Sequence, residues 1–192
     1  TYNDATGEYE VAEITFIGAE WVNMFLDEID TTSSLSITNV TVDTFRAWIL
    51  EGMQKFAGTL NTMWTDLSDF QDSGGKAIHY HGEADPNIPA ISSVVNQEQV
   101  HRVMFPSLNY TGGVTRLHDF HRLYLVPGAA HCTPSAANGP YPQTILRSII
   151  DWVEQDIVPI TLNATILQGN RKGQSQPLCT FPLRPMWRDN ST

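Results

Sequence analysis

The first third of the chain has one segment with a clear helical spacing of apolar residues. From about residue 42 to residue 60, large apolar side chains recur every three or four positions, and a glycine at position 58 closes the segment. This spacing predicts an amphipathic helix. Residues 1 to about 40 alternate short apolar runs with polar linkers, which predicts irregular structure with short helices at best. The apolar positions of the predicted helix are Phe45, Trp48, Ile49, Met53 and Phe56.

Near residue 74 the pattern changes to short apolar runs that are bounded by turn residues. Residues 76–80 predict a buried strand that ends in His81 and Gly82, and residues 120–126 predict a second strand that ends at Pro127. Because each strand is followed by a loop and a helical segment, the order is typical of an α/β fold with a parallel sheet.

The helical segments of this second part follow the two strands. Helices are expected from residue 92 to about 104 and from Pro142, at the first helical position, to about residue 156. The Gly112-Gly113 pair between them predicts a turn. Residues 176–185 contain several prolines and predict a strap over the surface rather than a sheet strand.

Composition and charge exclude several classes of protein. The 192 residues are 41% hydrophobic, which is typical of a globular chain, and 11 basic against 21 acidic side chains give a net charge of −10. An acidic surface would repel a phosphate backbone, so we expect no nucleic-acid partner. The chain contains no apolar run of about 20 residues, so we expect no membrane-spanning segment.

The sequence also carries signals of a secreted glycoprotein. Four Asn-X-Ser/Thr triplets in this length exceed what chance supplies, although chance clustering in an Asn- and Thr-rich chain is the alternative. Two cysteines, Cys132 and Cys179, are too few for a disulfide scaffold. They either pair with each other or each reach a partner on another chain. The candidate glycosylation sites are Asn39, Asn109, Asn163 and Asn190.

Two residues that follow the predicted strands carry the candidate chemistry. Asp85 comes shortly after the first strand and His131 shortly after the second. In a parallel sheet both loops rise at the same edge, so a carboxylate can accept the Nδ1–H of the imidazole and leave Nε2 as a general base. Each residue alone is more often a turn former or a surface residue. Their order matches the last two triad members of α/β-hydrolases, but no Gly-X-Ser-X-Gly precedes them.

The other histidines suggest no metal site. His79 and His81 alternate on the first strand, and His118 and His121 have a spacing that occurs in some metal sites. Neither pair has a third and fourth ligand at suitable spacing, so we expect no zinc or iron.

The segments 74–89 and 124–132, which contain Asp85, His131 and Cys132, resemble the fungal tannase and feruloyl esterase family. These are secreted α/β-hydrolases with a Cys-Ser…Asp…His-Cys pattern. The resemblance runs from about residue 67 to about 158 and is strongest to fungal tannases that are processed into two chains. It implies that residues 1–60 are the C-terminal portion of an inserted lid domain. Residues 61–192 are then the C-terminal portion of an α/β-hydrolase domain.

The resemblance also implies roles. Asp85 and His131 become catalytic residues, and the nucleophilic serine lies on the N-terminal chain of the same precursor. Cys132 is expected to form a disulfide with the cysteine beside that serine, and Cys179 is expected to bond to the same partner chain. No cofactor is expected in this chain, and any structural calcium belongs to the partner.

The resemblance predicts a tannin acylhydrolase that cleaves gallate esters, which are phenolic esters. A feruloyl esterase that acts on hydroxycinnamate esters is the alternative. A galloyl group needs polar partners, and Glu83 and Asn87 beside Asp85 are the candidates. A noncatalytic glycoprotein subunit is the third alternative, and it predicts that Asp85 and His131 lie too far apart to hydrogen-bond.

Overall fold

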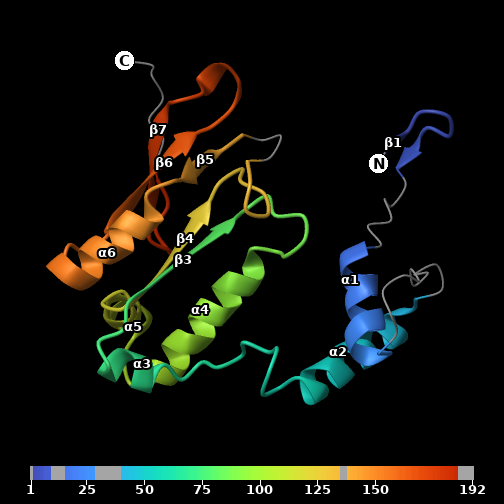
Figure 1. Ribbon diagram of the computed structural model, residues 1–192, viewed down its shortest axis with the longest axis horizontal. Coiled ribbons are helices and arrows are strands. Elements are labelled where there is room, and N and C mark those ends of the chain that lie inside the picture. The colour runs from blue at the N-terminus through green and yellow to red at the C-terminus, as the bar shows by residue number, and fades with distance from the viewer. Residues whose placement is uncertain (1, 10–15, 29–39, 135–137, 186–192) are drawn as a thin grey trace. The chain divides into compact units, whose positions relative to one another are not determined.

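A computed structural model describes residues 2–9, 16–28, 40–134 and 138–185 (Figure 1). The chain divides into two compact units, Thr1–Met63 and Trp64–Thr192. No helix in the described parts combines the length and the apolar character that crossing a membrane requires.

The first unit is mainly helical. Strands β1 (Tyr2–Asn3) and β2 (Glu8–Tyr9) form a small antiparallel hairpin that the sequence did not predict. Helix α1 (Phe16–Trp21) continues directly into a π-helical turn, η1 (Val22–Leu26), and these are the short helices expected in this region. Helix α2 (Val42–Lys55) confirms the predicted amphipathic helix but ends five residues earlier than residue 60.

Aromatic rings hold the helices of this unit together. The ring of Trp21 lies 5.5 Å from that of Phe25 and 5.7 Å from that of Phe56, measured between centroids. Gly52 allows this approach, because a Cβ atom there would lie 2.8 Å from the Trp21 ring. Helix α2 ends where the amides of residues 59–61 turn back to the carbonyl of Phe56. Within this unit the predicted apolar stripe stays partly uncovered, and Phe45 is 57% exposed.

The second unit is built around two parallel strands, as the sequence predicted. Strand β3 (Ala77–Gly82) pairs with β4 (His121–Val126) in a register that places Ala77 beside His121 and Gly82 beside Val126. Because both strands end at the same level, the loops that follow them begin side by side.

A three-stranded antiparallel sheet extends this pair. It consists of β5 (Pro140–Pro142), β6 (Thr161–Ile166) and β7 (Ser175–Cys179), in that order. A bridge between Tyr124 and Thr180 and a 2.7 Å hydrogen bond from the Phe181 amide to the Leu123 carbonyl attach it to β4.

The strap predicted over residues 176–185 is therefore wrong for its first part. Pro177 is tolerated because it pairs with Asn163 on β6, while β4 approaches the chain only from Thr180 onward. At Pro177 the strand is still an edge, where the missing N–H costs no ladder bond.

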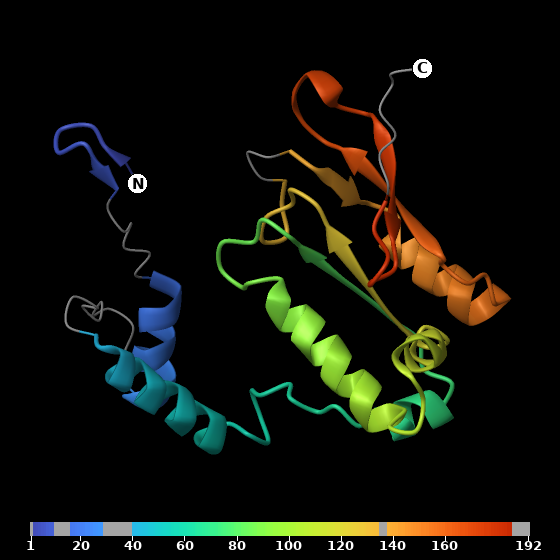
Figure 2. The ribbon, with the colours of Figure 1, turned by 180° about the vertical axis from the view of Figure 1, so that it is seen from behind.

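Two helices cover opposite faces of the β3–β4 pair (Figure 2). Helix α4 (Ile91–Met104) confirms the predicted helix and packs on the face that carries His81, which contacts Ser93. Helix α6 (Ile145–Gln155) packs on the other face through Trp152, which is 2% exposed. The shorter helices are α3 (Ser68–Asp72) and η2 (Gly169–Arg171). The buried side chains of the main core are Tyr124, Val126, Ala129, Leu162, Ala164 and Leu178.

Two further predictions are wrong. Gly112 and Gly113 form no turn but lie inside helix α5 (Tyr110–Leu117). Gly113 is needed there for packing, because a Cβ atom would lie 2.2 Å from Nε2 of His101 on α4. Pro142 does not begin a helix but ends strand β5, and α6 starts three residues later at Ile145.

Candidate active site

The loops that follow β3 and β4 are joined by backbone hydrogen bonds. The amide of Glu83 donates to the carbonyl of Val126 at 3.0 Å, and the amide of Ala84 donates to that of Ala129 at 2.9 Å. Gly82 makes this contact feasible, because a Cβ atom there would lie 2.4 Å from the Ala129 oxygen. The two loops are therefore tied to each other at this edge of the sheet.

This edge brings together the two residues singled out from the sequence. Nδ1 of His131 lies 2.9 Å from Oδ2 of Asp85. The Asp85 side chain is 5% exposed, whereas that of His131 is 45% exposed. Because an ionised carboxylate only accepts hydrogen bonds, Nδ1 must carry the proton, and the basic lone pair of the ring is on Nε2.

Asp85 is held in its charged form. Burial by itself raises the pKa of Asp85, but hydrogen bonds from the Ile88 amide, from His131 and from the Asn87 amide outweigh burial and lower the pKa to about 2. The two amides donate to Oδ1 at 3.0 and 2.8 Å. Oδ1 is thus occupied by the loop backbone, and Oδ2 faces His131.

A cavity of about 290 Å³ lies at this pair. Two tyrosine rings, Tyr80 and Tyr141, meet edge to face in its wall with centroids 6.1 Å apart. Burial, the contact with Tyr80 and the thiol of Cys132 raise the pKa of Tyr141 to about 12, so its phenol stays neutral. The lining residues are Tyr80, His81, Gly82, Asp85, Ile88, Val126, Ala130, His131, Cys132 and Tyr141.

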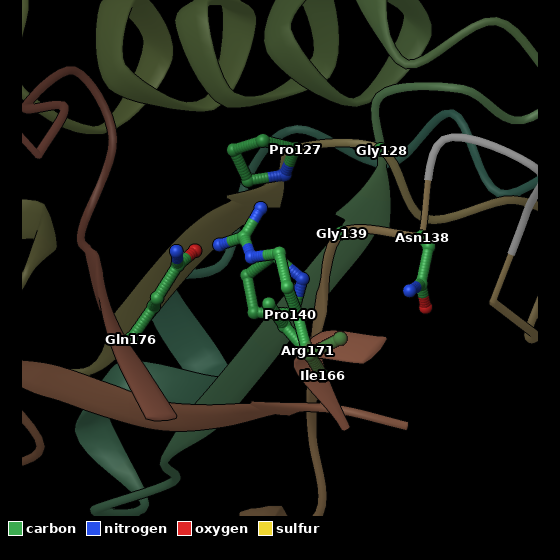
Figure 3. Close-up of a pocket in the computed structure, with 8 residues that line it drawn as sticks. All are labelled: Pro127, Gly128, Asn138, Gly139, Pro140, Ile166, Arg171 and Gln176. Atoms are coloured by element: carbon green, nitrogen blue, oxygen red, sulfur yellow. The ribbon is translucent and has the colours of Figure 1, made fainter. Parts of the chain in front are cut away.

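A second cavity, of about 420 Å³, lies beside the first residues of the His131 loop (Figure 3). The Arg171 side chain extends across it toward Pro127, while the Asn138 side chain turns away. None of the described residues that line this second cavity is a carboxylate, a histidine or a cysteine. The cavity at Asp85 and His131 is therefore the better candidate for chemistry.

The other predicted site residues are placed differently. Glu83 forms an ion pair with Arg184, with 2.7 Å between Oε1 and Nη2. Asn87 contributes its backbone amide to Asp85, and the residue is exposed. Neither residue lines the cavity at His131, and their role in substrate binding stays a prediction.

Both cysteines are free thiols in this structure, so they are not joined to each other. Cys132 is exposed and Cys179 is partly buried. Bonds from either of them to a partner chain stay predictions.

Two of the four candidate glycosylation sites can be located. Asn109 is exposed and caps α5, because its side-chain oxygen accepts the Gly112 amide at 2.8 Å. Asn163 is exposed on β6. Asn39 and Asn190 lie outside the described residues.

By sequence, His79 and His81 stand out only as possible metal ligands. Among the described residues, no three His, Cys, Asp or Glu side chains gather where they could hold a metal ion. His81 instead lines the cavity, with Nε2 3.4 Å from Oδ2 of Asp85. Its position four residues before Asp85, at the end of a strand, is the sequence signal that could have identified it.

The family model "Tannase and feruloyl esterase" matches residues 6–192. A tannase from Aspergillus oryzae is 43% identical over 192 residues, which is all of this chain and 32% of that protein. The chain therefore spans about a third of the length of this relative.

Solved structures agree with this match. The tannin acyl hydrolase from Aspergillus niger superimposes with a TM-score of 0.87 at 44% identity, over 100% of this chain and 34% of the other. Feruloyl esterase B from Aspergillus oryzae superimposes with a TM-score of 0.68 at 25% identity, over 85% of this chain and 33% of the other.

Proposed function

Because this chain belongs to the tannase and feruloyl esterase family, we propose that it supplies two of the three catalytic groups of a serine carboxylic-ester hydrolase. The resemblance carried by residues 74–89 and 124–132 is confirmed, and it extends over residues 6–192 rather than about 67–158. The observation that carries the proposal is the 2.9 Å contact between His131 and Asp85 beside a cavity.

The proposed mechanism follows from the direction of that hydrogen bond. Nε2 of His131 removes the proton from a serine hydroxyl as the serine oxygen attacks the ester carbonyl. The imidazolium then gives this proton to the leaving alcohol, and an acyl-enzyme remains. Water, deprotonated by the same nitrogen, releases the acid and restores the serine. Asp85 keeps the imidazole in the required tautomer and stabilises its positive charge.

The serine is proposed to lie outside this chain. The sequence has no Gly-X-Ser-X-Gly ahead of Asp85, and the chain spans about a third of its relatives. We therefore assign the nucleophile and the amides that stabilise the oxyanion to the N-terminal chain of the same precursor. Any structural calcium is assigned to that chain as well, and no cofactor is assigned to this one.

The two thiols suggest how the chains are joined. Cys132 is exposed and follows His131 directly, so a disulfide from it to the neighbour of the serine would keep the imidazole within reach of the nucleophile. Cys179 is proposed to bond to the same partner. On a denaturing gel this chain should then migrate alone only after reduction. Migration alone without reductant would contradict the interchain bonds.

The helical unit is proposed to be the C-terminal portion of a lid domain, over residues 1–60, with the hydrolase portion following over residues 61–192. Helix α2 leaves a row of apolar side chains partly exposed within this unit, and Met53 is 40% exposed. Together with Trp21 and Trp48 they line an apolar cavity of about 350 Å³. An apolar surface of this kind suits contact with an aromatic ester.

Gallate esters are the proposed substrates. Identity is 43–44% to the two proteins named for tannin hydrolysis and 25% to the feruloyl esterase, which favours the first activity. Hydroxycinnamate esters are the alternative.

A noncatalytic glycoprotein subunit would not need an acid–base pair held at 2.9 Å, so the geometry favours an enzyme. Secretion is proposed from the four triplets, of which Asn109 and Asn163 are exposed.

The test compares His131→Ala with the wild-type full-length protein on methyl gallate and methyl ferulate. We expect kcat to fall by about 10³-fold or more, because the general base is lost. The fold should survive because His131 is 45% exposed. His118→Gln is the control, since His118 donates to the carbonyl of Phe181 and lies outside the cavity. Full turnover in His131→Ala would end the proposal.

A further inference from the structure

A second histidine touches the loop that carries Asp85. Nε2 of His81 lies 2.9 Å from the carbonyl oxygen of Ile88 and 3.4 Å from Oδ2 of Asp85. Its Nδ1 lies 2.6 Å from the hydroxyl of Ser93 on α4. The side chain of His81 is 11% exposed, and Ser93 is 6% exposed. Both ring nitrogens of His81 therefore have hydrogen-bond partners, and little of the side chain is exposed to solvent.

These contacts fix the tautomer of His81. Nε2 faces a carbonyl and a carboxylate, which only accept, so Nε2 must carry the proton. Nδ1 then accepts from the Ser93 hydroxyl. The Ser93 oxygen in turn lies 3.1 Å from Nε2 of His79, which donates to it. The result is a directed chain of hydrogen bonds from His79 through Ser93 to His81 and on to the Asp85 loop.

The chain acts on Asp85 in two ways. His81 places an N–H dipole 3.4 Å from Oδ2, the same oxygen that His131 contacts. His81 also holds the carbonyl of Ile88, whose own amide donates to Oδ1 of Asp85 at 3.0 Å. One imidazole thus lies beside Oδ2 and is hydrogen-bonded to the residue whose amide binds Oδ1.

We propose that His81, oriented by Ser93, is a positioning residue that holds the Asp85 carboxylate against His131. This inference rests on the proposed function, because it assigns a role in the same site. His81 touches neither the ester nor the serine. It acts by limiting the motion of Asp85, so its loss should lower the rate of the chemical step more than the binding of substrate.

The titratable groups around His81 are few. Asp85 lies on one side, and the ring of His79 lies 6.4 Å away on the other, followed by the ring of His121 at 6.4 Å from His79. Helix α4 contributes the hydroxyl of Ser93. Burial, with a smaller contribution from His81, lowers the pKa of His79, so no second positive charge competes for Asp85 near neutral pH.

The experiment uses the full-length protein and a gallate ester. In His81→Leu we expect kcat to fall by about tenfold or more with KM changed less than about twofold. Without the nearby N–H, Asp85 should hold the protonated form of His131 more strongly. The acid limb of the kcat/KM profile should therefore move to higher pH by about half a unit. A purely structural role would lower the active fraction without moving this limb.

Three further variants sharpen the test. His81→Gln retains an N–H at the end of its side chain and should recover most of kcat. Ser93→Ala removes the hydroxyl that orients the His81 ring and should move kcat and the acid limb in the same direction as His81→Leu. If His81→Leu does not fold, the kcat and the acid limb of Ser93→Ala test the positioning role instead. His118→Leu removes another partly buried imidazole that donates to a backbone carbonyl, and it should leave the acid limb in place.

The outcomes separate the two proposals. If His131→Ala is inactive while His81→Leu and Ser93→Ala keep wild-type kcat and the wild-type acid limb, only the positioning role is wrong. If His131→Ala keeps full turnover, the proposed function is wrong. A shifted limb in His118→Leu would also overturn the positioning role, because it would show that loss of an imidazole outside the cavity has the same effect.

Discussion

Acidification should destabilise the protein through a histidine that has no part in the proposed reaction. His121 lies on β4, is 8% exposed, and its Nδ1 has no hydrogen-bond partner among the described residues. Burial first, and then the neighbouring His79 and His118, lower its pKa from the ordinary value of 6.5 to about 4. The folded protein therefore keeps this imidazole neutral where an unfolded chain would protonate it.

The sign and size of the effect follow from proton linkage. Between pH 6.5 and 4 the unfolded chain takes up a proton that the folded chain does not, so stability falls as the pH falls through this window. Lowering the pKa of His121 by this amount reduces the free energy of unfolding by about 2 kcal/mol at pH 5. Well below pH 4, where both states are protonated, the reduction reaches about 3 kcal/mol. Above pH 6.5 both states are neutral, and the effect vanishes.

The variant His121→Phe removes the titrating group and keeps a ring of similar size. We expect its midpoint of thermal unfolding at pH 7.5 to stay near or above the wild-type value, because a buried nitrogen without a partner is lost. At pH 5 the variant should gain a further advantage on the order of 5 °C. Scanning calorimetry of both proteins at both pH values measures this difference. An advantage of equal size at pH 5 and pH 7.5 would refute the linkage.

Two predictions concern packing. Gly82→Ala would place a Cβ atom 2.4 Å from the Ala129 oxygen, so it should displace the His131 loop and lower kcat by about 100-fold on a gallate ester. Gly58→Ala, whose Cβ would meet nothing within 4 Å, is its control, and equal activity of the two variants would contradict this reasoning. Trp152→Ala should lower the free energy of unfolding in urea by about 3–5 kcal/mol, because Trp152 is 2% exposed beneath Lys76 and Arg122. A loss below that of an exposed substitution such as Leu146→Ala would show that this face is not part of the core.

The sequence was sufficient where local pattern and tertiary packing agree. Apolar runs bounded by glycine and proline located β3 and β4 almost to the residue, and the parallel pairing of these strands explains why Asp85 and His131 meet over 46 positions. Both residues follow strand ends, so the rule that ligands bind beyond the carboxyl ends of parallel strands was enough to locate them.

The sequence was insufficient where tertiary contacts override local preference. Gly113 reads as a turn residue, but its place in α5 is decided by the ring of His101 on another helix. Pro177 reads as a strand breaker, but the edge position of β7 removes the penalty. The spacing of His81 from Asp85 was the one available signal, but the contacts of His81 with Ser93 on α4 and with the Ile88 carbonyl form only in the folded chain.

Because backbone hydrogen bonds join the loops after β3 and β4, the contact between Asp85 and His131 forms from residues of this chain alone. Val126 and Ala129 receive their amide donors from the neighbouring loop of the same chain, and Asp85 receives its own from Asn87 and Ile88. Under the proposed function, the N-terminal chain has only to place its serine hydroxyl next to an imidazole that Asp85 already orients.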